Sequence, residues 1–246
     1  MTEPNIISFD SLNSTQTKLI ELNKNSELSE FSVVTCRSQT EGKGQQNNVW
    51  ESQSGKNITC SLLLRPSFLC PSKQFLLTKA LSLGVSDFLE KYIKSSDVKI
   101  KWPNDIYVKN NKICGILVQN TIIGQQFDTA YCGIGINVNQ IKFDKAPNPT
   151  SLAMETDKNN YDLGLLFSEL LDCLIARYKS LKISTTSINS QYLHKLYLFK
   201  TMAFYMYRNE KIEAKITAVD RYGHLILEDK AKRTIQSSLK EINFLL

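Results

Sequence analysis

Hydrophobic residues follow two different periodicities along the first 196 residues of the chain. Short apolar runs predict strands, and apolar residues three and four positions apart predict helices. The predicted strands are 6–9, 31–35, 58–64, 98–102, 106–108, 112–119 (paired with 106–108 through a turn at 110–111) and 131–138. The predicted helices are one that starts after the N-cap residues 13–15, and those at 72–93, 163–181 and 187–196. Residues 37–57 and the segment around Pro147 and Pro149 are predicted loops. Together these elements predict an α+β domain.

The pattern changes after residue 196. Apolar side chains alternate with polar ones between Ile212 and Ala218, and turn-forming residues occur at 208–209 and 222–223. Such alternation is typical of short strands with one buried face. We therefore expect one domain at 1–196 and a small β-barrel at 197–246.

Composition and charge narrow the class of protein. Of the 246 residues, 42% are hydrophobic and 22% are charged, which is typical of a globular protein with a buried core. The net charge of +6 is scattered, so it favours an acidic ligand or partner but does not by itself indicate nucleic-acid binding. The N-terminus lacks a signal-peptide pattern, and the apolar runs are shorter than the roughly 20 residues of a membrane span. We expect a soluble, cytoplasmic protein with no membrane partner.

The cysteines and histidines give little support for a metal centre. The six cysteines, at 36, 60, 70, 114, 132 and 173, form no Cys-x-x-Cys pair, and His194 and His224 are far apart in the sequence. A zinc cage and a disulfide framework are therefore weak interpretations. Reduced thiols in the cytosol fit better.

Segment 39–44, Gln-Thr-Glu-Gly-Lys-Gly, is a candidate for anion binding. Its glycines allow backbone N–H groups to approach an anion, and Lys43 adds a positive charge. A solvated turn is the alternative, because glycine is more common in turns than in sites. The spacing fits neither a Walker A loop nor a Rossmann fingerprint.

Segment 101–105, Lys-Trp-Pro-Asn-Asp, ends a predicted strand abruptly. Proline has no N–H donor and restricts the residue before it, so the strand stops at Trp102. Asn104 and Asp105 then present an amide and a carboxylate that a nucleotide or its metal ion can use. A plain Pro-Asn-Asp turn is the alternative.

Two further segments combine glycine with polar groups. Lys112 begins an apolar strand, where its ammonium can reach a carboxylate or phosphate, and Gly115 lets a ligand lie against the backbone. Segment 133–139, Gly-Ile-Gly-Ile-Asn-Val-Asn, joins a close-approach strand to a polar end. A surface lysine, glycines at strand bulges and turn asparagines are the alternatives.

These segments occur in the order found in one family, and the chain resembles biotin–protein ligases. That family shows Ser-Thr-Asn near its start, a Gly-Arg-Gly-rich loop ending in Trp, Lys-Trp-Pro-Asn-Asp, Lys-x-x-Gly-Ile-Leu and Gly-Ile-Gly-x-Asn. The corresponding segments here are 14–16, 42–50, 101–105, 112–117 and 133–137, and the resemblance is strong over about residues 8–140. It implies a catalytic domain like that of class II aminoacyl-tRNA synthetases, with a mixed sheet flanked by helices, and an SH3-like β-barrel at 197–246.

The resemblance implies an ATP-dependent, monofunctional ligase that makes biotinyl-5′-AMP with Mg²⁺. It then transfers biotin to one lysine of a biotin carboxyl carrier protein. The implied biotin-binding residues are Ser14, Thr15, Gln39, Gly42, Lys112, Gly115 and Gly135. The implied nucleotide-binding residues are Lys43, Gln45, Asn48, Trp50, Asn104 and Asn137. The implied catalytic residues are Lys112, Lys43 and Asp105, and Asp105 is also the candidate metal ligand.

The chain departs from the family pattern at three positions. Gln45 stands where an arginine commonly holds the adenylate, Asn47 replaces a glycine, and Gln16 replaces the asparagine after Ser-Thr. Glutamine brings no charge, so we expect the adenylate to be held less tightly. Only 13 residues precede Ser14, which predicts a ligase without DNA binding.

Three other functions stay open at this point. A lipoate–protein ligase shares the catalytic fold, although Lys-Trp-Pro-Asn-Asp and the Ser-Thr start favour biotin. The altered loop also fits a non-catalytic protein that binds biotin or its adenylate. An interaction protein built on the C-terminal barrel is the third alternative.

Overall fold

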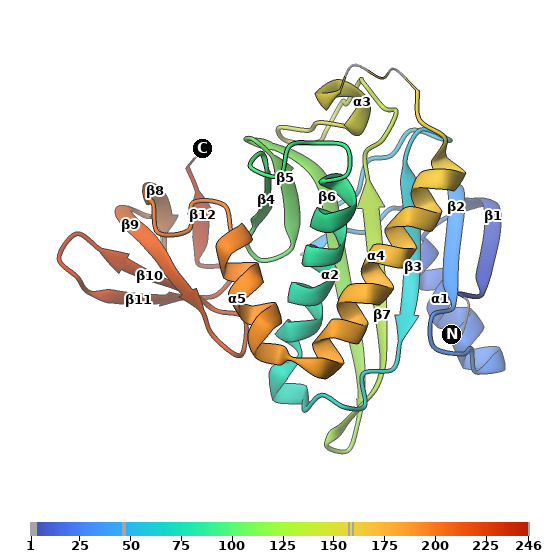
Figure 1. Ribbon diagram of the computed structural model, residues 1–246, viewed down its shortest axis with the longest axis horizontal. Helices are drawn as coiled ribbons and strands as arrows, with labels where there is room; N and C mark the ends of the chain where they lie inside the picture. Colours follow the sequence, from blue (N-terminus) through green and yellow to red (C-terminus); the bar gives the residue numbers. More distant parts are fainter. Residues whose placement is uncertain (1–3, 46–47, 157, 159, 246) are drawn as a thin grey trace.

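A mixed β-sheet lies at the centre of the fold (Figure 1). The computed structural model describes residues 4–45, 48–156, 158 and 160–245, so Asn47 lies outside the described residues. In the described chain seven strands have the order β1-β2-β3-β7-β6-β5-β4, with β1 and β2 parallel and the other neighbours antiparallel. Their bounds are β1 (Ile6–Leu12), β2 (Val33–Gln39), β3 (Ile58–Leu64), β4 (Val98–Lys101), β5 (Asp105–Val108), β6 (Asn111–Ile123) and β7 (Gln126–Ile136). The α+β class with a mixed sheet is confirmed.

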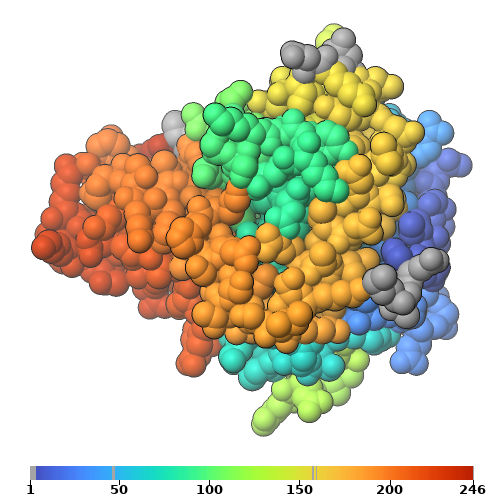
Figure 2. Space-filling view, in the orientation of Figure 1, coloured from blue at the N-terminus to red at the C-terminus, as the bar shows by residue number. Residues whose placement is uncertain are grey.

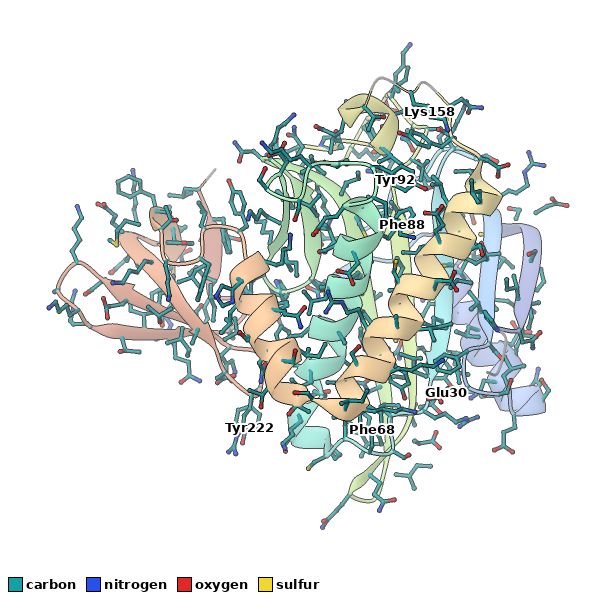
Figure 3. All side chains as sticks on the ribbon, viewed as in Figure 1. Glu30, Phe68, Phe88, Tyr92, Lys158 and Tyr222 are labelled. Atoms are coloured by element: carbon teal, nitrogen blue, oxygen red, sulfur yellow. The ribbon has the colours of Figure 1, made fainter. Side chains whose placement is uncertain are left out.

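Three helices cover one face of this sheet, as Figures 1 and 2 show: α2 (Phe75–Leu89), α4 (Leu163–Ile183) and α5 (Thr185–Lys195). Helices α2 and α4 approach closely at Gly84, where an added Cβ would lie 3.0 Å from the Cα of Leu174. Phe88 and Tyr92 lie near the C-terminal end of α2 (Figure 3). There the Tyr92 hydroxyl donates to Glu169 on α4 at 2.8 Å. This face carries the larger hydrophobic core.

The opposite face of the sheet is covered only in part. Helix α1 (Thr15–Ser26) packs Leu19 against Val34 of β2 and Leu63 of β3. The Ser14 side chain caps this helix by accepting from the Thr17 N–H, as the sequence predicted. The part of this face over β5, β6 and β7 is left for the cavity described below.

The C-terminal residues form a second antiparallel sheet with the order β11-β10-β9-β8-β12. Its strands are β8 (Met202–Tyr207), β9 (Glu210–Val219), β10 (Leu225–Asp229), β11 (Thr234–Ser237) and β12 (Ile242–Phe244). The predicted turns at 208–209 and 222–223 are confirmed, with positive φ at Arg208, Asn209 and Gly223. In the described residues β11 and β12 are not paired with each other, so the sheet is open where a closed barrel was predicted.

Buried polar contacts attach this second sheet to the end of β4. The Trp102 indole N–H donates to the Gly223 carbonyl at 2.9 Å. On α2, the buried Lys79 ammonium donates to Asn189 at 2.8 Å and to the Val219 carbonyl at 3.5 Å. Burial lowers the pKa of Lys79 to about 8, while Asp220 opposes that shift. The two sheets therefore meet through Trp102, which directly follows β4, and through Lys79 on α2.

Several element bounds differ from the sequence prediction. The β6–β7 hairpin extends to a turn at Gly124, which has φ 60°, because both strands continue as an exposed ribbon beyond the core. The turn predicted at 110–111 has its positive φ at Lys109, and β2 continues to Gln39 inside the predicted loop. The short helix α3 (Leu152–Glu155) was not predicted, since four residues are too few for a periodic pattern.

We predict that Gly223→Ala destabilises the fold. The positive φ of 94° costs alanine about 1–2 kcal/mol. A Cβ there would lie 2.6 Å from the Phe75 ring, which adds about 1–3 kcal/mol of overpacking. Gly124→Ala is the matched control, because its φ is also positive but its Cβ meets nothing within 4 Å. Urea midpoints measure both variants, and equal losses would contradict the proposed Phe75 contact.

Candidate active site

A cavity of about 420 Å³ lies on the sheet face that α1 covers only in part. It is lined by the start of α1, the loop after β2, the ends of β4 to β7 and the C-terminal sheet. The predicted site residues among its lining are Ser14, Thr15, Gln39, Lys43, Gln45, Asn48, Trp50, Asn104, Asp105, Lys112, Gly115 and Gly135. Segments far apart in the sequence therefore meet at one cavity.

A row of paired residues crosses the sheet under this cavity. Lys101 pairs with Asp105, Asp105 with Gly115, and Gly115 with Gly135. Directly paired residues on neighbouring strands direct their side chains to the same face. The two glycines therefore leave a flat floor of backbone, and Asp105 and Lys101 stand at one end of it.

Lys112 reaches this face because β6 contains a β-bulge. Ile106 pairs with Cys114 and Tyr107 with Lys112, so Ile113 is an extra residue in the ladder. In a regular strand, residues three apart lie on opposite faces. The extra residue reverses that relation, and Lys112 and Gly115 share the cavity face while Ile113 and Cys114 are both fully buried in the core.

Lys112 and Asp105 form an ion pair at the edge of the glycine floor. The Lys112 Nζ lies 2.8 Å from Asp105 Oδ1, and both side chains keep more than a quarter of their surface exposed (27% and 28%). Partial exposure screens the attraction, so the pair is easily exchanged for contacts with an anionic ligand. Two of the three residues predicted as catalytic are thus in direct contact, and Lys43 is not part of this pair.

Hydroxyl and amide groups gather at the other end of the cavity. The Gln39 Oε1 accepts from the backbone N–H of Thr15 at 2.8 Å and from its hydroxyl at 3.1 Å. The Thr15 hydroxyl also lies 2.9 Å from the Ser61 hydroxyl, and Ser14 is buried beside them. This cluster can exchange hydrogen bonds with a small polar ligand.

The Trp50 indole lies on the glycine floor. A Cβ added to Gly135 would be 2.5 Å from its Nε1, and one added to Gly115 would be 3.1 Å from its Cζ3. Its Nε1 is buried without a hydrogen-bond partner in the described part of the chain. The next residue, Glu51, accepts from the backbone N–H groups of residues 144–146 at 2.8–3.0 Å and so fixes this end of the loop. In this conformation Trp50 fills space above both glycines.

In the loop after β2, the predicted residues Lys43 and Gly42 have different surroundings. The Lys43 ammonium donates to the Thr17 hydroxyl on α1 at 3.1 Å, although Lys43 also lines the cavity. Gly42 does not appear among the described lining residues; a Cβ there would lie 2.5 Å from the Trp50 carbonyl oxygen. Gly42 therefore serves the close approach of two backbone segments, and its contact with biotin stays a prediction.

Of the three predicted asparagines, Asn104 and Asn137 are buried and Asn48 is exposed. The Asn104 amide donates to the Ile116 carbonyl on β6, which ties the motif turn to the sheet. Asn137 lies beyond the described lining of the cavity and donates to the Thr150 carbonyl at 3.0 Å. Its Oδ1 is buried with no partner in the described residues.

Some lining residues received no site role from the sequence, although Gln16 was recognised as a departure from the family motif. Ser61 and Gln16 face the cavity, and Gln16 donates to the Tyr131 carbonyl at 3.2 Å. Polar residues at alternate positions of the strand 58–64 were a usable signal for Ser61. The C-terminal sheet also contributes Leu239, Ile242, Asn243 and Phe244. No local pattern could have found these four, because their position depends on long-range packing.

The cysteines do not form a metal site in the described chain. All six are free, and burial raises the pKa of Cys60 to about 12. Among the described residues there is no group of three or more His, Cys, Asp or Glu side chains suited to hold a metal ion. Nor does any described helix have the length and apolar character to cross a bilayer.

Comparison with known proteins identifies the family. The sequence model of the biotin/lipoate A/B protein ligase family matches residues 8–137, more than half of the chain, and the chain belongs to this family. The bifunctional ligase/repressor BirA of Bacillus subtilis is 32% identical over 177 residues, which cover 71% of this chain and 54% of that protein. The biotin–[acetyl-CoA-carboxylase] ligase of Mycobacterium tuberculosis is 29% identical, with 49% and 44% covered. The chain thus spans about half the length of the curated relatives it matches.

Solved structures share the fold over nearly the whole chain. The biotin protein ligase from Aquifex aeolicus has a TM-score of 0.77 at 24% identity, with 97% of each chain covered. A biotin protein ligase-like protein of unknown function from Silicibacter has a TM-score of 0.72 at 10% identity, with 95% and 93% covered. At these identities the likeness establishes the biotin protein ligase fold and leaves the activity to the site residues.

We predict that Gly135→Ala displaces the Trp50 indole and that Gly133→Ala does not. The new Cβ at 135 would collide with the indole, whereas at 133 it would meet the Gln16 Oε1 at 2.9 Å. Trp102, the other tryptophan, is buried and hydrogen-bonded, so it gives a constant background. A red-shifted tryptophan emission is expected only for Gly135→Ala. Equal spectra for the two variants would show that the indole does not rest on Gly135.

Proposed function

We propose that this chain is an ATP-dependent biotin–protein ligase. It activates biotin to biotinyl-5′-AMP and transfers biotin to a lysine of a biotin carboxyl carrier protein. The observation that carries the proposal is the Lys112–Asp105 pair beside the Gly115–Gly135 floor, in one cavity with the Ser14–Thr15–Gln39 cluster. The Aquifex aeolicus neighbour, a complex with biotin and ATP, supports the same substrates.

In the first step, the biotin carboxylate oxygen attacks the α-phosphorus of ATP. The bond from that phosphorus to the bridging oxygen breaks, and pyrophosphate leaves with the electron pair. A carboxylate is ionised at neutral pH, so this step needs no general base. Catalysis rests on positioning two anions and on neutralising charge, which Lys112 does from the edge of the floor.

In the second step, the amine of the acceptor lysine attacks the acyl carbon and AMP leaves. The amine must lose a proton, and Asp105 is the proposed base. Asp105 is suited to this because Lys112 leaves it when the ammonium turns to the acyl-phosphate. The carboxylate is then free beside the reacting carbon.

The remaining residues divide into a group for biotin and a group for the nucleotide. Ser14, Thr15 and Gln39 hydrogen-bond the ureido ring of biotin, and Gly115 and Gly135 lie along its pocket, with Gly42 shaping the loop beside it. Lys43, Gln45, Asn48, Trp50, Asn104 and Asn137 serve the nucleotide. These assignments take the family pattern at the matching positions, and the shared cavity supports most of them.

The residues present fit Mg²⁺ carried by ATP. Asp105 offers a carboxylate on the cavity wall, while a cluster of three or more His, Cys, Asp or Glu ligands is absent among the described residues. Magnesium usually keeps several waters and takes one or two protein oxygens with substrate phosphates. When bound, it would neutralise phosphate charge; Asp105 is the proposed protein ligand.

We further propose that residues 1–196 are the catalytic domain and 197–246 an SH3-like domain. The open five-stranded sheet of the described C-terminal residues supports this division, although closure into a barrel is the finer part of the proposal. The six free cysteines support a reducing, cytoplasmic location.

The direct test incubates the chain with ATP, Mg²⁺, biotin and a biotin-acceptor domain and follows the acceptor mass. We expect a gain of one biotin, and roughly 10²–10³-fold slower gain for Lys112→Ala, because a charge-stabilising group is lost. Lys109→Ala is the control, since Lys109 pairs with Glu155 away from the cavity. No gain from folded protein would refute the ligase proposal. Gain with lipoate in place of biotin would favour the lipoate ligase, and biotin binding without ATP–pyrophosphate exchange would favour a non-catalytic binder.

We predict that Gln45→Arg slows release of biotinyl-5′-AMP. Gln45 lines the cavity, and arginine would add a charge-assisted hydrogen bond to the phosphate. Such bonds contribute about 1.5–3 kcal/mol, which corresponds to roughly 10- to 100-fold slower release. A single-turnover assay measures the released adenylate, with Gln45→Lys as the variant that adds charge without the planar fork. Unchanged release by Gln45→Arg would refute the expectation of a weakly held adenylate.

A further inference from the structure

One part of the cavity lining, called the lobe below, has no role in the assignments above. Beyond Asp105 it is lined by Lys101 and Tyr107 from the central sheet and by Leu239, Ile242, Asn243 and Phe244 from the C-terminal sheet. Lys101 is the one cationic side chain among these lobe residues. It lies in the same row as Asp105, Gly115 and Gly135, so its side chain is on the cavity face.

Lys101 is held by neutral groups. Its ammonium donates to the Tyr107 hydroxyl at 3.1 Å and lies 4.9 Å from the Tyr107 ring centre and 5.2 Å from that of Phe244. In the described chain no carboxylate oxygen lies within 4.0 Å of it, whereas Lys112 has one at 2.8 Å. Burial lowers the pKa of Lys101; Asp105 opposes the shift, and Lys112 adds to it. A half-buried cation without a carboxylate partner is stabilised when an anion enters beside it.

We propose that Lys101 is a further catalytic residue, which binds the pyrophosphate released in the first step. This rests on the proposed ligase function. In that step the electron pair of the broken phosphorus–oxygen bond passes to pyrophosphate, so negative charge grows on the leaving group. Lys112 serves the carboxylate and the α-phosphate, and Lys101 neutralises the β- and γ-phosphates in the lobe next to it. Tyr107 is the positioning residue that aims the ammonium.

The central sheet and the C-terminal sheet contact each other at this lobe. Lys101 contacts Phe244 of β12 and Trp102 contacts Gly223, so two consecutive motif residues touch the C-terminal sheet. Asn243 of β12, which is exposed, lines the same lobe. The pyrophosphate lobe is therefore complete only when the C-terminal sheet is in place.

The test separates the two half-reactions. Biotin-dependent ATP–pyrophosphate exchange follows the first, and transfer from synthetic biotinyl-5′-AMP to an acceptor domain follows the second. For Lys101→Met we expect exchange to slow roughly 10- to 100-fold, with a raised KM for pyrophosphate, because a charged hydrogen-bond donor is lost. Transfer from the synthetic adenylate should stay within about twofold of the unsubstituted chain, since its pyrophosphate is already absent.

Three variants complete the design. Lys101→Arg should restore most of the exchange, because it keeps the charge. Lys99→Met removes the same charge two residues earlier, on the same strand and face. Because Lys99 is not among the described lining residues of the cavity, this control variant should leave both half-reactions unchanged. Tyr107→Phe keeps the ring and removes the hydroxyl, so it should raise the KM for pyrophosphate more mildly; it also tests the lobe if Lys101→Met does not fold.

Three results would overturn the inference. Exchange that is unaffected by Lys101→Met would exclude a pyrophosphate role. Equal losses in exchange and transfer would make Lys101 a structural support of Phe244. Loss of transfer alone would assign Lys101 to the acceptor protein. If the unsubstituted chain performs neither half-reaction, the proposed function itself fails, which is a different outcome from any of these.

Discussion

One extra residue in β6 determines which side chains meet in the cavity. Ile113 forms a bulge opposite the Ile106–Tyr107 step, and this bulge brings Lys112 to the same face as Gly115. Without it, a lysine three residues before the floor glycine would enter the core beside Cys114, where an unpaired ammonium is strongly disfavoured. The spacing Lys-x-x-Gly therefore reflects the geometry of the bulge as well as the chemistry of the lysine. The ion pair with Asp105, the flat floor and the position of Lys112 all depend on this register.

The motif at residues 101–105 combines structural and chemical duties. Trp102 donates to the second sheet, Asn104 donates to β6, and Tyr192 on α5 donates to the Pro103 carbonyl at 2.8 Å. Three of the five residues are thus held by hydrogen bonds to other parts of the fold, although all five line the cavity. Asp105 and Lys101 remain, and both face the cavity on the same row. A rigidly held turn between two charged side chains positions them without help from a ligand.

The sequence predicted the parts of this molecule that depend on local chemistry. Strands, the long helices, the Ser14 cap and the turn at 208–209 follow from periodicity and turn residues, and the structure confirms them. Most predicted site residues also meet in one cavity, since the motifs were recognised together. What could not be predicted depends on distant contacts. The Ile113 bulge needs the ladder with β5, and the open edge of the C-terminal sheet needs all its strands. Phe244 reaches the cavity through the contacts between the two sheets, among them Trp102–Gly223.

The position of Trp50 places a further condition on any ligand. Its indole occupies the surface of Gly115 and Gly135, so a molecule that is to lie on those strands must first exchange places with it. Hydrogen bonds hold the backbone on both sides of Trp50, so only the loop that carries the indole moves in this exchange. Glu51 accepts from three backbone N–H groups, and the Gly42 carbonyl accepts from the Trp50 N–H at 2.8 Å. The indole N–H has no partner in the described chain, so leaving the floor sacrifices apolar contact but no hydrogen bond. A ligand with comparable apolar area, such as the ring and chain of biotin, can replace that contact and leave the indole free to cover it.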